Sequence, residues 1–206
     1  MKKLTLALIL IAGVASGCNK AERSPRTAEA APDPKASVIE ASRKFYALKA
    51  LSGNIDAVGE TSFKQHVDYA APDRYRVSYL DAKGAAMEMI IVGDQTYIKE
   101  GDTWKKAPAG HNPTPTLRNS FSDEVLKSLS DVKFEGEQTV DGKPTLVYSY
   151  KLVTLVGNFP VTSKMWVAKN SGLPVKSYVE NPSGVLKNTT TTYDTESPVT
   201  IEPPIK

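Results

Sequence analysis

The chain has 206 residues, carries 26 Lys and Arg against 23 Asp and Glu, and has a formal net charge of +3. Two of the lysines, Lys2 and Lys3, belong to an N-terminal segment with the features of a signal peptide, so the rest of the chain is close to neutral. Its Lys and Arg do not cluster as they do on a surface that binds phosphates, which excludes a nucleic-acid-binding protein.

Residues 1–17 have the three parts of a secretory signal peptide. Residues 1–3 are a basic head, residues 4–14 are mostly apolar, and small residues follow. An apolar stretch of about 7–15 residues is typical of a signal peptide, whereas a transmembrane helix needs about 20. The sequence therefore predicts export and removal of this segment. The alternative is a buried N-terminal helix.

Cys18 is the only cysteine of the chain. A lone cysteine can be a nucleophile, a buried thiol or an attachment point, and a disulfide framework would need an even number. Residues 15–18, Ala-Ser-Gly-Cys, resemble the lipobox of bacterial lipoproteins, although Ala15 stands where leucine is usual. The resemblance implies cleavage before Cys18 and acylation of its thiol and amino group with chains such as palmitate. Each buried methylene contributes about 0.8 kcal/mol, so several acyl chains hold a protein on a membrane.

The residues after Cys18 indicate where the anchored protein resides. Asn19 follows it, and in lipobox sorting a residue other than aspartate implies the outer membrane, facing the periplasm, rather than the inner membrane. Residues 18–35 are rich in Ala, Pro and charged side chains and have no apolar period. Because such a composition cannot bury enough apolar surface to fold, we expect a lipidated, disordered tether over residues 18–35 and one domain over residues 36–206.

Two helices are predicted in this domain. Over residues 36–53, apolar side chains recur at steps of three and four, which places them on one helix face: Val38, Ala41, Phe45 and Leu48. Gly53 is expected to end this helix. A shorter helix is expected over residues 122–129, with Ser122 as its N-cap.

Most of the remaining sequence alternates apolar and polar residues with the period of two that is typical of β-strands. In residues 74–80, for example, Tyr75, Val77 and Tyr79 fall on one face. Turn signals separate about ten or eleven such runs, which favours an antiparallel meander, and a sheet of this size tends to curl. We therefore predict an α+β fold: a curved antiparallel sheet forming an unclosed half β-barrel of about 10–11 strands, with one long N-terminal helix and a short lid helix.

Four stretches carry a resemblance to a known fold: a Pro-x-x-aromatic-Arg strand start, a Gly/Asp turn with an aromatic hairpin, a Trp-Val and Gly-Leu-Pro-Val hairpin, and a tail. They are residues 71–79, 92–108, 164–180 and 199–204. In this order they resemble the LolA/LolB-like superfamily of bacterial envelope lipoproteins, which includes the LppX/LprG-type lipid-binding proteins. The turn at residues 93–95, Gly-Asp-Gln, departs from the usual Asp-Gly. This argues against close kinship with the soluble carrier LolA but not against the fold.

The resemblance implies a membrane-anchored lipoprotein that faces the periplasm and binds or transfers a lipid or lipoprotein acyl chain in an apolar cavity. We expect no cofactor and no metal, since the sequence contains no motif for either. An acyl chain outside a membrane needs such a concave, apolar site. Side chains expected to face inward are candidates for its wall: Phe45, Leu48, Phe63, Tyr75, Val77, Tyr79, Tyr148, Tyr150 and Trp166. For each of them the alternative is core packing.

Two further features leave alternatives open. The apolar run at residues 152–161 is either a tip that contacts lipid or membrane or an ordinary hairpin. The chain has only two histidines, His66 and His111, and no metal-binding, phosphate-binding or serine-nucleophile motif, so we expect no enzyme. The alternative function is a non-catalytic structural or sensing module that binds another envelope protein.

Overall fold

The computed structural model describes residues 33–108, 117–154, 158–182 and 184–205. The chain separates into two units, residues 1–31 and residues 32–206, and the fold below is that of the second unit. Several predictions fall on positions outside the described residues: the signal peptide, Cys18, the tether as far as residue 32, and His111.

Helix α1, Pro34–Tyr46, begins where a capping residue meets a proline. The Asp33 carboxylate accepts a hydrogen bond of 3.0 Å from the Lys35 backbone N–H. Proline lacks a backbone N–H, but an N–H in the first turn of a helix has no acceptor within the helix, so Pro34 costs no hydrogen bond there. One face of α1 is buried, as its spacing predicts, by Val38, Ala41, Ser42 and Phe45. Residues 34 and 35, assigned to the tether by composition, therefore belong to the helix.

The prediction that α1 continues to Gly53 is wrong. The helix ends at Tyr46, and strand β1, Ala50–Gly59, follows almost at once with Gly53 in its middle. The backbone of β1 forms hydrogen-bonded ladders with a strand on each side, which outweigh the helical propensity of its first residues. The apolar spacing of residues 36–48 is helical only as far as Tyr46.

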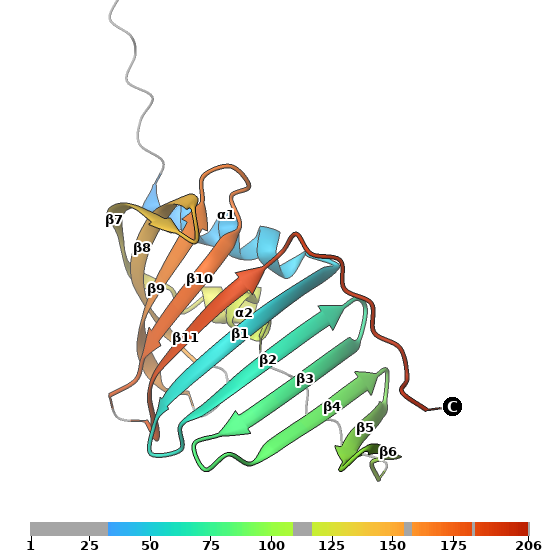
Figure 1. The fold of residues 1–206 in the computed structure, drawn as a ribbon. Coiled ribbons are helices and arrows are strands. Elements are labelled where there is room, and N and C mark those ends of the chain that lie inside the picture. Colours follow the sequence, from blue (N-terminus) through green and yellow to red (C-terminus); the bar gives the residue numbers. More distant parts are fainter. Residues whose placement is uncertain (1–32, 109–116, 155–157, 183, 206) are drawn as a thin grey trace, which may run out of the picture. The chain divides into compact units, whose positions relative to one another are not determined.

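The sheet contains eleven strands in the order β6-β5-β4-β3-β2-β1-β11-β10-β9-β8-β7, and every neighbouring pair is antiparallel. Besides β1, the strands are β2 (Phe63–Ala70), β3 (Arg74–Asp81), β4 (Ala86–Val92), β5 (Gln95–Glu100), β6 (Thr103–Lys106), β7 (Ser130–Val140), β8 (Lys143–Val153), β9 (Pro160–Ala168), β10 (Pro174–Glu180) and β11 (Leu186–Asp194). Strands β6 and β7 are the two edges, so the sheet does not close. The predicted unclosed antiparallel sheet of about 10–11 strands is thus confirmed, and its curvature is compatible with a half-barrel (Figure 1).

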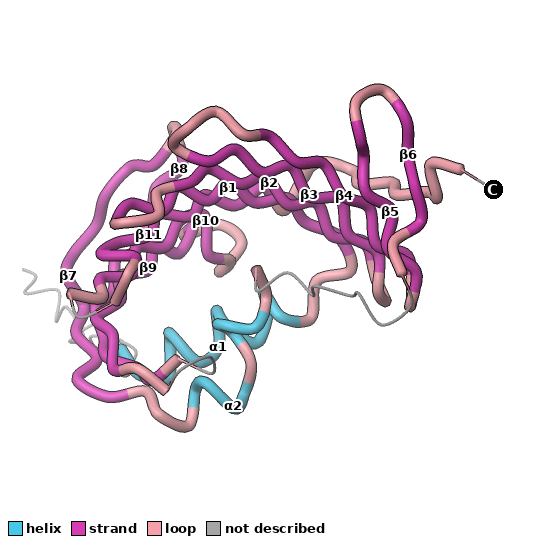
Figure 2. Tube along the Cα trace, turned by 90° about the horizontal axis from the view of Figure 1, so that it is seen from below, coloured by secondary structure: helices cyan, strands magenta, loops and turns pink. Residues whose placement is uncertain are grey.

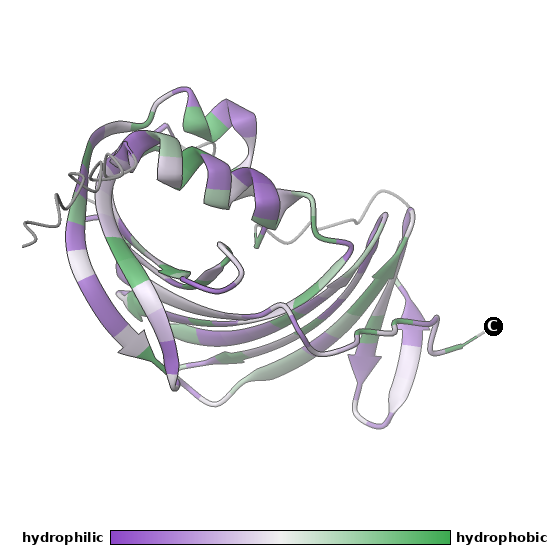
Figure 3. Ribbon diagram, turned by 90° about the horizontal axis from the view of Figure 1, so that it is seen from above, coloured by the Kyte–Doolittle hydropathy of each residue, from purple (hydrophilic) through white to green (hydrophobic). Residues whose placement is uncertain are grey.

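The helices cover the concave face of the sheet (Figures 2 and 3). After β6 the chain returns beneath this face through a 3₁₀ turn, η1 (Asn119–Phe121), and helix α2 (Asp123–Leu126). Ser122 caps α2 as predicted, accepting a hydrogen bond from the Val125 N–H, although α2 has only four residues. The main core lies between these elements and the sheet and includes Phe45, Leu51 and Phe121.

The C-terminal tail packs on the opposite, outer face of the sheet (Figure 1). Ile201 is 1% exposed and forms a small cluster with Ile90 and Tyr97. The Arg74 guanidinium donates a hydrogen bond of 2.7 Å to the Ile201 carbonyl oxygen and is 3.2 Å from the Glu202 carboxylate. The tail is therefore packed on the outer face of β3, β4 and β5 rather than free.

Replacing Ile201 by alanine is expected to lower the free energy of unfolding by about 2–5 kcal/mol, since it empties a fully enclosed site. The matched control is Ile205→Ala, at a position that is 37% exposed, where the loss should be below about 1 kcal/mol. Urea denaturation of both variants measures the difference. Equal losses would mean that the tail is not packed as described.

Candidate functional site

A cavity of about 250 Å³ lies on the concave face. Its wall is formed by side chains of β8 to β11 together with β1, β2 and the segment around η1. Among the described residues that line it, none carries a charged side chain. The described wall is therefore mainly apolar and uncharged, whereas the outer surface of the domain is rich in ion pairs.

The roof of the cavity is the segment at residues 117–121. A Cβ atom added to Gly53 would lie 2.6 Å from Leu117 Cδ1. Because glycine has no Cβ, the Leu117 side chain can pack directly on the backbone of β1. The ring of Phe121 lies 4.4 Å from that of Phe45 and 5.7 Å from that of Tyr193, measured between centroids. Aromatic contacts of this kind stabilise the roof against both α1 and the sheet.

Arg118 holds the roof segment, residues 117–121, in place through contacts with Tyr46 and Tyr69. Its guanidinium lies between two aromatic rings, 4.7 Å from the centroid of Tyr46 and 4.2 Å from that of Tyr69. It also donates a hydrogen bond to the Tyr46 carbonyl oxygen. Because cation–π contacts strengthen as water is removed, this partly buried arginine holds the roof to α1 and β2.

Hydroxyl groups occupy one part of the cavity wall. Ser163, Ser177 and Thr191 come from β9, β10 and β11, and each is at most 9% exposed. The Ser177 hydroxyl is 2.7 Å from that of Tyr193, whereas the Ser163 hydroxyl has no hydrogen-bond partner among the described residues. The wall thus combines apolar surface with a compact set of neutral polar groups.

Two of the predicted wall residues, Phe63 and Tyr150, line the cavity. Five others belong to the core cluster on the same face or pack against it: Phe45, Leu48, Tyr75, Val77 and Tyr148. Tyr79 lies beside Phe63, with ring centroids 5.1 Å apart, and is not among the described residues that line the cavity. For most of these side chains the structure therefore favours core packing.

The prediction for Trp166 needs correction, because its side chain lies on the outer face. Its neighbour Met165 belongs to the concave-face core, and a step of one residue along a strand reverses the face. Trp166 packs with Val147 and Val175, and its indole N–H donates a hydrogen bond of 2.8 Å to the Gln138 side chain. Apolar residues fill both faces of the second half of β9, Met165 to Ala168, which hides the alternation there.

Sequence reasoning missed the hydroxyl residues and the roof. Ser163 and Thr191 fall at inward positions of their strands, two residues from Met165 and Tyr193, so a strict alternation would have placed them there. Leu117 and Phe121 come from a connection without period, and no local pattern announces their burial.

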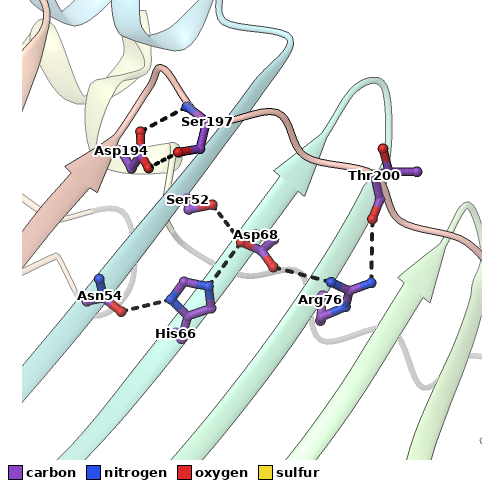
Figure 4. A network of polar contacts seen from close by, with 8 residues as sticks. All are labelled: Ser52, Asn54, His66, Asp68, Arg76, Asp194, Ser197 and Thr200. Atoms are coloured by element: carbon purple, nitrogen blue, oxygen red, sulfur yellow. Dashed lines mark hydrogen bonds and ion pairs between the residues drawn. The ribbon is translucent and has the colours of Figure 1, made fainter.

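A second polar cluster lies on the outer face and centres on Asp68 (Figure 4). Its carboxylate accepts a hydrogen bond of 2.6 Å from Ser52 and lies 3.0 Å from His66 Nε2. The other ring nitrogen, Nδ1, is 2.8 Å from the Asn54 side chain. Both nitrogens of His66 are thus engaged by groups other than a hydroxyl, so His66 does not activate Ser52 as the base of a catalytic triad does.

Arg76 links this cluster to the C-terminal tail. Its guanidinium is 3.7 Å from the Asp68 carboxylate and donates a hydrogen bond of 3.4 Å to the Thr200 carbonyl oxygen.

Within the described ranges, no group of three or more His, Cys, Asp or Glu side chains is arranged to hold a metal ion. No described helix is long and apolar enough to cross a membrane.

Comparison with solved structures identifies the architecture. The lipoprotein LppX of Mycobacterium tuberculosis superposes with a TM-score of 0.61 at 15% identity, over 82% of this chain and 98% of LppX. LprF of Mycobacterium bovis superposes with a TM-score of 0.67 at 14% identity, over 85% of this chain and 99% of LprF. The chain has an LppX-like fold. This confirms the resemblance read from the sequence, while no protein-family profile and no curated protein matches the sequence.

The LppX-like domain is expected to lose stability as pH rises from about 10 to 12. Burial raises the pKa of Tyr193 from 10.0 to about 12, and hydrogen bonds with Ser177 and Thr191 oppose the shift. Above pH 10 the unfolded chain releases a proton that the folded chain retains, so the free energy of unfolding falls by up to about 1.4 kcal/mol per pH unit.

Urea denaturation at pH 9, 10 and 11 measures this slope. Tyr193→Phe should remove its share of the slope. An unchanged slope in Tyr193→Phe would show that this phenol is not the titrating group.

Proposed function

We propose that this protein is a non-catalytic cell-envelope lipoprotein that binds the acyl chain of a lipid, or of another lipoprotein, in its concave-face cavity. The observation that carries the proposal is the mainly apolar cavity beneath the roof at residues 117–121, whose described lining residues carry no charge. Ligand sites typically measure about 300–1,000 Å³, and at about 250 Å³ this cavity suits one chain rather than a bulky headgroup. Its apolar wall supplies the favourable transfer of methylene groups from water.

We further propose that Cys18 anchors the domain. In this reading residues 1–17 direct export, the acylated Cys18 sits in the outer membrane, and the tether lets the domain face the periplasm. The LppX-like fold supports this assignment, since LppX is itself a lipoprotein. The composition of residues 19–32 suits a flexible spacer between a bilayer and a folded domain.

Transfer of the chain to or from a membrane is supported by apolar side chains at one end of the sheet. Phe159 and Val185 are each at least half exposed, and they stand on the turns that follow β8 and β10. Thr154, directly after β8, and Leu186, the first residue of β11, line the cavity. Exposed apolar groups next to a binding site are typical of surfaces that contact membranes, so we place the entrance for the acyl chain at this end.

Filling the cavity should abolish lipid binding. Val179 lines the cavity, and Val179→Trp places an indole in it. The full chain is purified from membranes, extracted with organic solvent and analysed by mass spectrometry. About one acyl lipid per protein is expected for the unchanged chain and at least tenfold less for Val179→Trp.

The matched control for this experiment is Val58→Trp, at an exposed position of β1, which should retain the lipid. Circular dichroism checks that both variants fold. Absence of lipid from the unchanged chain, together with one stoichiometric protein partner after crosslinking in cells, would instead support the alternative function as a sensing module.

Cys18→Ser should release the protein from the membrane fraction or stall its processing, because serine offers no thiol for acylation. Fractionation of cells and the mass of the mature chain measure the two effects. Ser16→Ala changes a neighbouring residue without removing the thiol and should leave the protein on the membrane. A Cys18→Ser protein that is normally cut and remains membrane-bound would contradict the proposed anchor.

A further inference from the structure

The outer face of the sheet carries a groove of about 770 Å³, on the other side of the sheet from the concave-face cavity. It crosses five neighbouring strands: β11, β1, β2, β3 and β4. Two rows of outward residues form its walls, and within each row the residues stand opposite one another in the ladders. The first row is Thr192, Asn54, His66, Ser78 and Glu88, and the second is Thr190, Asp56, Lys64, Leu80 and Ala86. The floor is the backbone of the row between them, whose side chains point to the concave face.

The register of the ladders gives the outer-face groove the dimensions of one extended polymer. Two residues along a strand span about 7 Å, and neighbouring strands lie about 4.8 Å apart, so five strands give the groove a length of about 19 Å. Its volume is within the range of about 300–1,000 Å³ that is typical of ligand sites. The groove therefore suits a narrow chain of a few units that lies across the strands.

The charged side chains of the groove are already paired within the domain. Lys64 Nζ lies 3.9 Å from the Asp56 carboxylate, and Lys99 donates a hydrogen bond of 2.7 Å to the Glu88 carboxylate. His66 is engaged in the polar cluster shown in Figure 4. A charged ligand would have to compete with these contacts, whereas a neutral ligand would not.

The neutral polar groups of the two walls have no such partners. The hydroxyl groups of Ser78, Thr190 and Thr192 form no hydrogen bond with any other described residue. The Asn54 side-chain oxygen lies 2.8 Å from His66 Nδ1, which leaves the N–H groups of this amide as donors. Because a hydroxyl group both donates and accepts, β11, β1 and β3 together offer both kinds of hydrogen-bonding group to a bound molecule.

The floor of the groove argues against a polypeptide ligand. An extended peptide gains affinity by pairing its main chain with an exposed sheet edge. All five strands of the groove have a neighbour on each side, so their backbone N–H and C=O groups are used in the ladders. Hydroxyl and amide side chains remain, and these match a ligand that carries hydroxyl groups along its own length.

We propose that the outer-face groove binds a neutral oligosaccharide. Its hydroxyl groups exchange hydrogen bonds with Asn54, Ser78 and Thr192, and the apolar face of a sugar ring packs on Leu80, which is 45% exposed. Ligand sites typically combine a few placed polar groups with apolar contact in this way. The groove lies on the opposite face from the acyl-chain cavity, so this inference does not depend on the proposed function.

The test titrates the full chain, in a detergent that contains no sugar, with four short probes: cellotetraose, chitotetraose, tetragalacturonate and tetra-alanine. Isothermal titration calorimetry gives the dissociation constants. At least one of the two neutral saccharides is expected to bind with a Kd below about 1 mM, and about tenfold more tightly than the anionic saccharide and the peptide.

Two substitutions assign this binding to the groove, and each has a matched control on the outer face. Thr192→Val removes one wall hydroxyl and should weaken the neutral saccharide about three- to tenfold, the range of one net hydrogen bond. Thr162→Val, at an exposed position of β9 outside the groove, should leave the affinity unchanged. Ser78→Trp fills the groove and should abolish binding, whereas Val58→Trp, outside the groove on β1, should retain it. Circular dichroism checks that all variants fold.

The outcomes are distinct from those of the lipid experiment. If neither neutral saccharide binds, or if tetragalacturonate or tetra-alanine binds as tightly, the proposed ligand class is wrong. If Ser78→Trp binds the saccharide as the unchanged chain does, the site is not this groove. Val179→Trp, which fills the concave-face cavity, should bind the saccharide normally.

Discussion

The pairing of β1 with β11 is the contact on which the rest of this domain depends. Every other ladder joins strands that are neighbours in sequence, and these hairpins alone would give two separate meanders. The β1–β11 ladder runs from Ser52 opposite Asp194 to Gly59 opposite Leu186 and fuses the meanders into one sheet. The cavity takes its wall from both of them. A change that weakens this single non-local ladder therefore has two effects at once: it opens the cavity, and it separates the two halves of the core.

An unclosed sheet leaves two edges, and each is protected in its own way. Strand β6 is only four residues long and carries Lys105 and Lys106. Strand β7 is long, but its register is interrupted twice, and Asp131 and Gly136 have positive φ angles. Short, charged or bulged edges resist pairing with another chain. The domain can thus keep a half-barrel open around a cavity without offering a regular edge for aggregation.

The sequence predicted the architecture better than the site, for a physical reason. Alternation and turn signals recur in every strand, so the curved antiparallel sheet emerges even when single strands are ambiguous. The helix at residues 36–53 was predicted too long because Leu48 continues the helical spacing, whereas pairing with β2 and β11 makes the residues from Ala50 onward a strand. Trp166 was placed on the wrong face because a strand that is buried on both sides shows no contrast.

The cavity depends on contacts between segments that lie far apart in the chain. Leu117 fits over Gly53, and no local pattern connects the two. Small hydroxyl residues such as Ser163 are common on any strand, and their place in the cavity wall depends on which strands lie beside them. Such information resides in three-dimensional packing, which patterning alone does not determine.

The strapped C-terminal tail has a consequence for the order of folding. The hydrogen bond from Arg74 to the Ile201 carbonyl oxygen joins residues separated by 127 positions, and the β1–β11 ladder spans a similar distance. Contacts between such distant residues form late and slowly. During synthesis the first half of the sheet forms before its distant partners exist. Strand β1 gains its neighbour β11, and β3 to β5 gain the tail on their outer face, only when the end of the chain has been made.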